Sequence, residues 1–285
     1  NVASARTLLT GTVGLEPEAL GGSKRWRVHV SATDLATRVV AAKSSVWIEN
    51  KDLDTTPTVA NAEAPVYLRD RALDGQIETA KRAPGGAASG AYMEGLSRSV
   101  VTTEAEDLYE QKRYDEALNK FLAAAQMRPE PSPRVHSGSY LSNMKLNRPG
   151  EAEKDFDKLV QIGLEGGTFS ARFLFAVNST EFVRDNTKRS EYTIWLRRIS
   201  RNLAGGQSCA TLVGHASKSG IESYNDRLSL QRAEEVRRQL VKLEAALANR
   251  TNAEGKGFRE NLVGSGTDDE KDQLDRRVEI RARSC

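Results

Sequence analysis

Asn225-Asp-Arg-Leu228-Ser-Leu-Gln-Arg232-Ala233 is the stretch that decides the fold of the C-terminal part of this chain. From Leu228 onward, apolar residues recur at three- and four-residue intervals, which predicts an amphipathic helix over Leu228–Leu247. The predicted buried stripe consists of Ala233, Val236, Leu240, Leu243 and Leu247. Glutamate and arginine side chains fill the opposite side, so one face of this helix should lie against a sheet while the other meets water.

Short apolar runs on both sides of this helix predict strands. Phe173–Val177 and Ala210–Val213 precede the helix, and Leu262–Gly264 and Val278–Ala282 follow it. A second helix is predicted between the first two runs, with one face formed by Tyr192, Trp195, Leu196, Ile199 and Leu203. The order β-α-β-α-β-β predicts a compact two-layer α/β domain over residues 168–285.

Five motifs lie in a fixed order along this domain. They are Phe175-Ala-Val-Asn178-Ser179, Gly214-His215-Ala-Ser217-Lys-Ser-Gly220, the helix start quoted above, Gly264-Ser-Gly266 and Asp275-Arg276-Arg277-Val278-Glu279-Ile280. Together they resemble the OmpA-like peptidoglycan-binding domain found at the C-terminus of OmpA, Pal and MotB. The family patterns are Gly-His-Thr-Asp-x-x-Gly for the loop and Asn-x-x-Leu-Ser-x-x-Arg-Ala for the helix start. The resemblance covers under half of the chain.

The resemblance implies non-covalent binding of peptidoglycan through diaminopimelate in the stem peptide. Diaminopimelate displays a carboxylate and an ammonium on one carbon, and an arginine pairs with a carboxylate in two places. Arg232 occupies the family's arginine position, and we expect Arg232→Ala to weaken binding while leaving the fold intact. The other candidate binding residues are Asn178, His215, Asn225, Arg276 and Arg277. For these residues, loop support or a structural ion pair is the competing interpretation.

The chain departs from the family pattern at Ser217, where the family has an aspartate. Serine accepts a hydrogen bond but does not neutralise an ammonium. Ser217 is therefore a candidate binding residue. The substitution leaves three alternatives: peptidoglycan binding is weaker, altered in specificity, or absent. Glu222 and Asp226 lie nearby in the sequence and would compensate only if they faced the same pocket.

The two cysteines, Cys209 and Cys285, flank predicted strands. In OmpA-like sheets the last strand runs antiparallel to the other strands. If the last strand neighbours the second here, the start of one meets the end of the other, and the resemblance then implies a disulfide between Cys209 and Cys285. Such a bond fits an oxidising periplasm. The alternative is a pair of free, buried thiols.

Helical periodicity and a repeat characterise residues 101–167. Tyr114-Asp-Glu-Ala117-Leu-Asn-Lys-Phe121 returns as Pro149-Gly-Glu-Ala152-Glu-Lys-Asp-Phe156 about 35 residues later, close to the ~34-residue unit of tetratricopeptide repeats. The region resembles degenerate repeats of that family, with four helices broken near residues 113–114, 129–133 and 148–150. Two such repeats should not fold alone. Their role is either a groove for a partner's peptide or a spacer.

The N-terminal hundred residues are less informative. β-Favouring runs at Leu8–Val13, Trp26–Val30, Val39–Ile48 and Ala64–Leu68 predict a small β-rich domain over residues 1–70. Apolar and polar residues alternate within the second run, as in a half-buried strand. Residues 71–100 contain a Gly- and Ala-rich stretch and are predicted to be a linker or exposed loop.

Composition narrows the class of protein. The chain carries a net charge of +3, with its basic excess in residues 168–285. No apolar stretch is long enough for a transmembrane helix. Two cysteines and three scattered histidines (His29, His136 and His215) do not form a zinc motif, so we expect no metal site. We also expect no cofactor and no nucleic-acid partner. We expect a periplasmic protein associated with the outer membrane or cell wall, attached through an N-terminal signal or lipid ahead of Asn1.

Two functional hypotheses follow. In the first, a non-catalytic cell-envelope protein anchors to peptidoglycan and engages an envelope protein through its N-terminal and repeat regions. In the second, the chain is a scaffold subunit of a secretion or motility assembly whose OmpA-like domain has lost or altered its ligand. Enzymatic cleavage of peptidoglycan is not expected, because the sequence shows no motif for a nucleophile and its base.

Overall fold

The computed structural model describes residues 5–17, 24–49, 58–68, 70–128, 132–167, 169–171, 173–183, 185–262, 264, 266 and 271–285. Contacts between residues divide the chain into two compact units. Unit 1 contains Asn1–Ala62 and Arg69–Gly138, and unit 2 contains Glu63–Leu68 and Ser139–Cys285. The finer division predicted from the sequence, with boundaries at residues 70, 100 and 167, stays a prediction.

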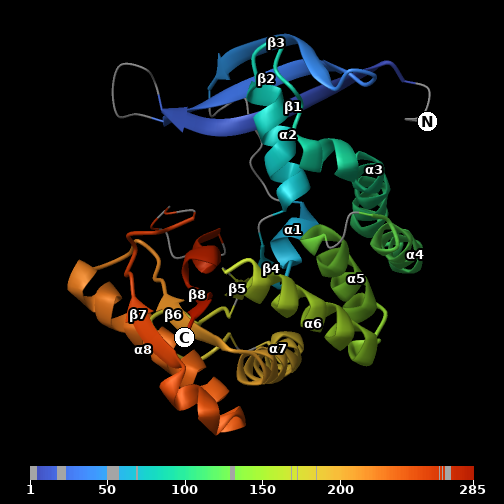
Figure 1. The fold of residues 1–285 in the computed structure, drawn as a ribbon. Helices are drawn as coiled ribbons and strands as arrows, with labels where there is room; N and C mark the ends of the chain where they lie inside the picture. Colours follow the sequence, from blue (N-terminus) through green and yellow to red (C-terminus); the bar gives the residue numbers. More distant parts are fainter. Residues whose placement is uncertain are drawn as a thin grey trace. The chain divides into compact units, whose positions relative to one another are not determined.

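Unit 1 begins with a three-stranded antiparallel sheet in the order β1-β2-β3 (Figure 1). Its strands are β1 (Thr7–Pro17), β2 (Lys24–Asp34) and β3 (Val39–Ile48), so the first three of the four predicted strands are present in this sheet. A tight turn joins β2 to β3, in which the Asp34 carboxylate accepts from the main-chain nitrogen of Thr37 at 2.7 Å. The predicted N-terminal β structure is therefore a simple meander.

The buried face of this sheet is the polar one, whereas a sheet usually buries its apolar face. In β2, His29 is buried whereas Val30 is exposed. Thr10, Ser31 and Thr33 lie on the same buried side as His29. Alternation along a strand shows that two faces differ, but it does not show which face the rest of the chain covers.

Helices occupy the segment for which the sequence favoured a linker. They are α2 (Arg71–Lys81) and the first part of α3 (Gly90–Glu110). The Asp70 carboxylate caps α2 by accepting from the main-chain nitrogen of Ala72 at 2.8 Å. A Cβ atom at Gly95 would lie 3.0 Å from the Cβ of Ala72. Small residues allow α2 and α3 to approach each other closely. A Gly- and Ala-rich segment has the composition of a linker, which is why the sequence favoured a linker here.

The helical middle consists of paired helices. Helix α3 is followed by α4 (Tyr114–Ala125), and α5 (Pro133–Lys145) is followed by α6 (Pro149–Glu165). The helix breaks lie where the sequence predicted them, although Pro129 falls outside the described residues. The repeated small and aromatic residues are buried: Ala117, Phe121, Ala124, Ala152 and Phe156. A side chain at Gly138 of α5 would overlap the ring of Phe121.

Unit 2 contains the predicted β-α-β-α-β-β order. Its elements are β5 (Ser170–Ala171), α7 (Asn186–Gly205), β6 (Ser208–Gly214), α8 (Glu222–Leu243), β7 (Thr251–Gly255) and β8 (Val278–Ser284), with 3-10 turns η3 (Ala245–Asn249) and η4 (Lys271–Asp275). The sheet order is β7-β6-β8, with β7 parallel and β8 antiparallel to β6. The C-terminal part is thus a mixed α/β domain, as predicted.

Three predicted elements of unit 2 were wrong in detail. Phe173–Val177 is not a strand, because its aromatic side chains fill an interior cluster: the rings of Phe173 and Tyr192 lie 5.4 Å apart. Leu262 and Gly264 belong to a loop whose amides bind a carboxylate, and Val263 is outside the described residues. The long helix begins earlier than predicted and ends at Leu243.

The segment before the first long helices joins unit 2. Helix α1 (Val59–Glu63) precedes β4 (Val66–Tyr67), which pairs antiparallel with β5. The predicted strand at Ala64–Leu68 is therefore present in shortened form, but its partner belongs to the C-terminal unit. No local pattern in the sequence indicates this long-range pairing.

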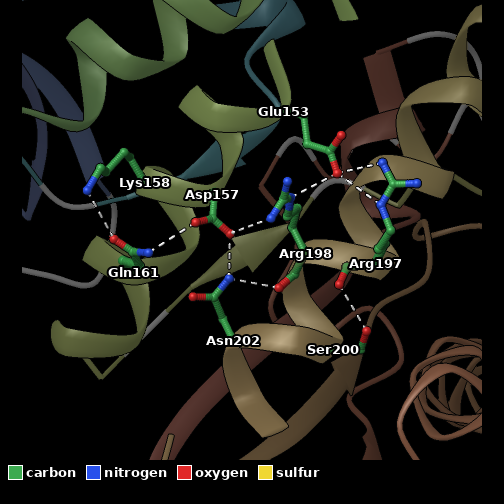
Figure 2. Close-up of polar contacts among 8 residues, drawn as sticks. All are labelled: Glu153, Asp157, Lys158, Gln161, Arg197, Arg198, Ser200 and Asn202. Carbon is green, nitrogen blue, oxygen red and sulfur yellow. Dashed lines mark hydrogen bonds and ion pairs between the residues drawn. The ribbon is translucent and has the colours of Figure 1, made fainter. Parts of the chain in front are cut away.

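Helix α6 of the second pair lies against α7 of the α/β domain. Trp195 Nε1 donates to the Tyr140 hydroxyl at 2.9 Å, and the rings of Phe156 and Trp195 stack at 5.5 Å. Figure 2 shows the polar part of this contact, where Glu153 accepts from Arg197 and Arg198. Helix α6 and the part of α5 from Ser139 onward therefore belong to unit 2.

Cys209 and Cys285 form a disulfide. Strand β6 pairs with β8 so that Cys209 faces Arg283, which brings the start of one strand to the end of the other. The predicted bond and its reason are both confirmed. None of the helices in the described part of the chain has the length and apolar content needed to cross a membrane.

Candidate functional site

The ends of β6 and β7 meet the first turns of α8 at very close range. A side chain at Gly214 would overlap the main-chain carbonyl of Ser229, and a Cβ at Gly255 would lie 2.7 Å from the Ser229 hydroxyl. Ser229 Oγ in turn accepts from the main-chain nitrogen of Gly257 at 2.9 Å. These contacts explain why the motifs need glycine and serine here, and they fix the position of Arg232, one turn further along α8.

Arg232 lies at the meeting point of three segments. Its Nε donates to the carbonyl of Ser179 at 3.0 Å, and its Nη2 to the carbonyl of Ala176 at 3.1 Å. Its Nη1 donates to the carbonyl of His215 at 3.2 Å. The guanidinium carbon also lies 5.3 Å from the centre of the Phe175 ring. Arg232 is buried, with 1% of its surface exposed, so it joins the 175–182 loop, the 214–220 loop and α8.

Asn178 lies at the tip of the 175–182 loop. It is exposed and adopts a left-handed backbone conformation with φ 51°, which asparagine tolerates better than most residues. The loop closes through the main-chain nitrogen of Ala176, which donates to the carbonyl of Glu181 at 3.0 Å. Asn178 therefore shapes the loop that supplies two of the carbonyls bound by Arg232.

Ser217 and Asn225 belong to the second loop and its support. Asn225 is buried, and its Nδ2 donates to the carbonyl of Ser219 at 2.6 Å. This bond ties the 214–220 loop to the first turn of α8. Ser217 is buried in the same loop, two residues after the carbonyl that Arg232 binds. The structure thus brings Arg232, Asn225 and Ser217 into one region.

His215 and Arg277 form a charged network beneath this loop. His215 is fully buried, and its Nε2 lies 3.6 Å from Oε1 of Glu279. Arg277 Nη2 donates to the same oxygen at 2.6 Å. Burial raises the pKa of Glu279, but the neighbouring His215 and the charge of Arg277 outweigh it and hold that pKa well below the usual range.

The oxygens of Glu260 and Glu279 lie within 4.8 Å of His215 and of one another, as ligands of a metal ion would. Arg281 Nη2, however, donates to Glu260 at 2.7 Å and to Glu279 at 3.1 Å. Because Arg277 and Arg281 already neutralise the two carboxylates, a cation would have to displace them. The arrangement favours an ion-pair network that supports the loop.

Asp275 has a role that the sequence analysis missed. Its carboxylate accepts from the main-chain nitrogen of Leu262 at 2.6 Å and of Gly264 at 2.7 Å. Asp275 is fully buried and thereby shapes the Gly-x-Gly loop. The sequence signal for this role was the acidic residue at the first position of the last motif, Asp275–Ile280. Its neighbour Arg276 is also buried, so Arg276 and Arg277 both lie inside the domain.

Glu222 and Asp226 face a different partner. Arg259 Nη1 lies 3.1 Å from Glu222 Oε1, and its Nη2 lies 2.7 Å from Asp226 Oδ1. These two acids therefore form a surface cluster with Arg259. Their geometry gives no support to the idea that they replace the missing aspartate at Ser217.

Residues 174–274 match the model of the OmpA family. Among solved structures, the chain is similar to the peptidoglycan-associated lipoprotein of Burkholderia pseudomallei, with 23% identity, a TM-score of 0.33 and coverage of 39% of this chain and 90% of that one. It is also similar to the cell wall anchor of the T6SS from Pseudomonas aeruginosa, with 23% identity, a TM-score of 0.33 and coverage of 46% and 96%. No curated protein sequence matches the chain.

A third similar structure is the periplasmic domain of Helicobacter pylori MotB, with 12% identity, a TM-score of 0.34 and coverage of 41% of this chain and 75% of that one. The family match covers residues 174–274, which lie within the C-terminal domain, and is the ground for calling that domain OmpA-like. It does not reach the paired helices, so their assignment as tetratricopeptide repeats stays a prediction.

Proposed function

We propose that the OmpA-like domain binds peptidoglycan non-covalently, through diaminopimelate of the stem peptide, and anchors the chain to the cell wall in the periplasm. The observation that carries this proposal is the position of Arg232, which lies where two motif loops and α8 meet. The family match over residues 174–274 supports it. The domain acts as a binding module and not as an enzyme.

The proposed roles of the other residues follow from their places around Arg232. Ser217 and Asn178 lie on the two loops beside it and would contact the ligand through their polar side chains. Asn225 holds the 214–220 loop to α8. His215, Arg276 and Arg277 support the same loops from inside the domain, and we assign them positioning roles.

We further propose that the N-terminal sheet and the paired helices engage an envelope protein. The contacts between α6 and α7, which include stacked aromatic rings and an ion pair, support a role of the second helical pair as a spacer. Association with the outer membrane is part of the same proposal.

A second candidate function is a scaffold subunit of an envelope secretion or motility assembly whose OmpA-like domain has lost or altered its ligand. Two observations favour it. Ser217 stands where the family has an aspartate, and all three nitrogen atoms of Arg232 already donate to main-chain carbonyls. A guanidinium used in this way has less capacity for a ligand carboxylate.

Co-sedimentation of the full chain with purified sacculi separates the two functions. The anchor function predicts that wild type and Arg238→Ala pellet equally, and that Arg232→Lys pellets less. Arg238 is the matched control, because it lies on the same helix with 76% of its side chain exposed. If wild type stays in the supernatant and Ser217→Asp pellets, the natural domain has abandoned this ligand and the scaffold function holds.

A further inference from the structure

Arg98 of α3 is a buried cation that forms no ion pair with the described part of the chain. Only 7% of its surface is exposed, and its Nη1 atom is buried with no hydrogen-bond partner. A guanidinium stays protonated in proteins, so titration does not remove this charge. An unpaired charge is costly to bury unless another group compensates it. A small, negatively charged partner would therefore stabilise this part of unit 1.

Arg98 lines a small cavity inside unit 1. The walls also include Ala124 and Met127 at the end of α4, and Ser132 and Val135 at the start of α5. The volume of this cavity is about 10 Å³, which is close to the minimum for one water molecule. The cavity therefore admits one small occupant and is too small for a phosphate or a whole carboxylate group.

Two carboxylates of the same region already bind other donors. Asp70 caps α2 and also accepts from the Ser132 hydroxyl at 3.1 Å. Glu106 accepts from Nε of Arg134 at 3.1 Å. Because neither carboxylate forms an ion pair with Arg98, the guanidinium charge is available to a ligand in the cavity.

The two helix ends at the cavity have opposite electrostatic effects. The first turn of α5 contains no acidic residue, and the amides of Arg134 and Val135 have no acceptor within the helix. The end of α4 contributes carbonyls, of which that of Ala124 accepts from the main-chain nitrogen of Met127 at 3.1 Å. Opposite helix ends carry about half a charge of each sign. Their effects cancel, so the full charge of Arg98 determines which ligand the cavity favours.

We propose that this cavity binds a chloride ion, which accepts from Nη1 of Arg98 and from the first amides of α5. A water molecule fits the same volume and accepts the same hydrogen bond, but it leaves the positive charge uncompensated. A chloride ion compensates the charge and connects α3 to the start of α5. The site belongs to unit 1, and it does not depend on peptidoglycan binding.

Anomalous diffraction from crystals of the full chain soaked in sodium bromide tests the site directly. Bromide is close to chloride in size and scatters anomalously. We expect a bromide peak in contact with Nη1 of Arg98. A cavity that holds only a water molecule, with no bromide in it, would overturn the proposal. This measurement needs no variant, so it remains decisive whatever a substitution does to the fold.

Hydrogen exchange of the full chain measures the effect of the ion in solution. Chloride at about ten times its dissociation constant should slow amide exchange in α3 and α4 by about tenfold, relative to sodium gluconate of the same ionic strength. Gluconate is too large for the cavity. Arg98→Met should abolish the difference, because it removes the charge and keeps an unbranched side chain. Arg82→Met is the matched control, since the Arg82 side chain is 46% exposed, and it should keep the difference.

Three results in solution would overturn the proposal. They are equal exchange of wild type in chloride and gluconate, a chloride effect that persists in Arg98→Met, and protection by acetate as strong as that by chloride, which would mean that the site accepts carboxylates. Far-UV circular dichroism of each variant verifies the fold. None of these outcomes bears on the sacculus experiment, so the two proposals fail separately.

Discussion

The Nη1 atom of Arg232 donates to the main-chain carbonyl of His215 at 3.2 Å. The residue proposed to bind the ligand therefore also holds the loop that carries Ser217. Nε and Nη2 tie the same guanidinium to the 175–182 loop. Ligand binding and loop geometry depend on one side chain, and experiments on Arg232 must measure both.

Arg232→Ala should destabilise the protein, contrary to the expectation from sequence that the fold would stay intact. The substitution removes three hydrogen bonds from a buried guanidinium to main-chain carbonyls, which should lower the free energy of unfolding by about 2–4 kcal/mol. Urea denaturation measures this loss. Arg238→Ala should change stability by less than about 0.5 kcal/mol because its side chain is exposed, and equal stability of the two variants would contradict the structural role of Arg232.

Ser217→Asp should strengthen binding to diaminopimelate-containing peptidoglycan. Position 217 is buried, so pairing with the ligand's ammonium must first offset the lost hydration of the new carboxylate. We expect a net gain of about 1 kcal/mol, or roughly a fivefold lower dissociation constant. Calorimetric titration with a soluble muropeptide measures the change. Ser219→Asp adds the same charge to the same loop, and an equal gain there would mean that net charge, not position 217, is responsible.

Reduction of the disulfide should cost about 2–4 kcal/mol of stability, because Cys209 and Cys285 close a long loop with a sequence separation of 76. Urea denaturation with and without reductant measures the difference, and Cys285→Ser should match the reduced wild type. Two titratable thiols per chain in denatured, unreduced protein would show that the bond does not form.

The α6–α7 contact should make stability depend on pH. Burial raises the pKa of Glu153, but hydrogen bonds and charges from Arg197 and Arg198 outweigh it and lower that pKa overall. A folded-state pKa below the unfolded value contributes stability above the unfolded pKa, near 4.3, which is lost as the pH falls through the folded value. Glu153 should therefore stabilise unit 2 at pH 7 and lose this effect in acid.

A comparison of variants isolates this effect. Glu153→Gln should cost about 1 kcal/mol at pH 7, after allowance for solvent screening, and nothing once Glu153 is protonated in acid. Glu151→Gln is the control, since Glu151 lies on the same helix and forms an exposed ion pair with Lys154 at 2.8 Å. A Glu153→Gln penalty that is the same at pH 7 and pH 3 would show that charge is not the cause.

Local patterns predicted the elements of the C-terminal domain, because the helix start, the glycine turns and the last strand depend on residues close in sequence. The motif around Asn225 and Arg232 also located the candidate site. The hydrogen-bond and ion-pair partners of the buried side chains could not be predicted from the sequence. Asp275 binds the amides of Leu262 and Gly264, and Glu279 lies beside His215; only the fold brings these groups together.

The errors have the same origin. An apolar run such as Phe173–Val177 fits a strand or an aromatic cluster, and neighbours distant in sequence decide between them. Glycines such as Gly95 serve linkers and close helix contacts alike. The alternation around Val30 predicts a strand, but only the position of α2 shows that its polar face is the covered one. Nothing yet tests whether residues 101–165 fold alone.

Recognition of diaminopimelate by the OmpA-like domain is tested by co-sedimentation of the full chain with sacculi in the presence of increasing free meso-diaminopimelate, with L-lysine as the matched competitor. We predict that the protein pellets with sacculi and that meso-diaminopimelate, but not lysine, releases it. Protein that never pellets, or that pellets and is released equally by both amino acids, would contradict the claim.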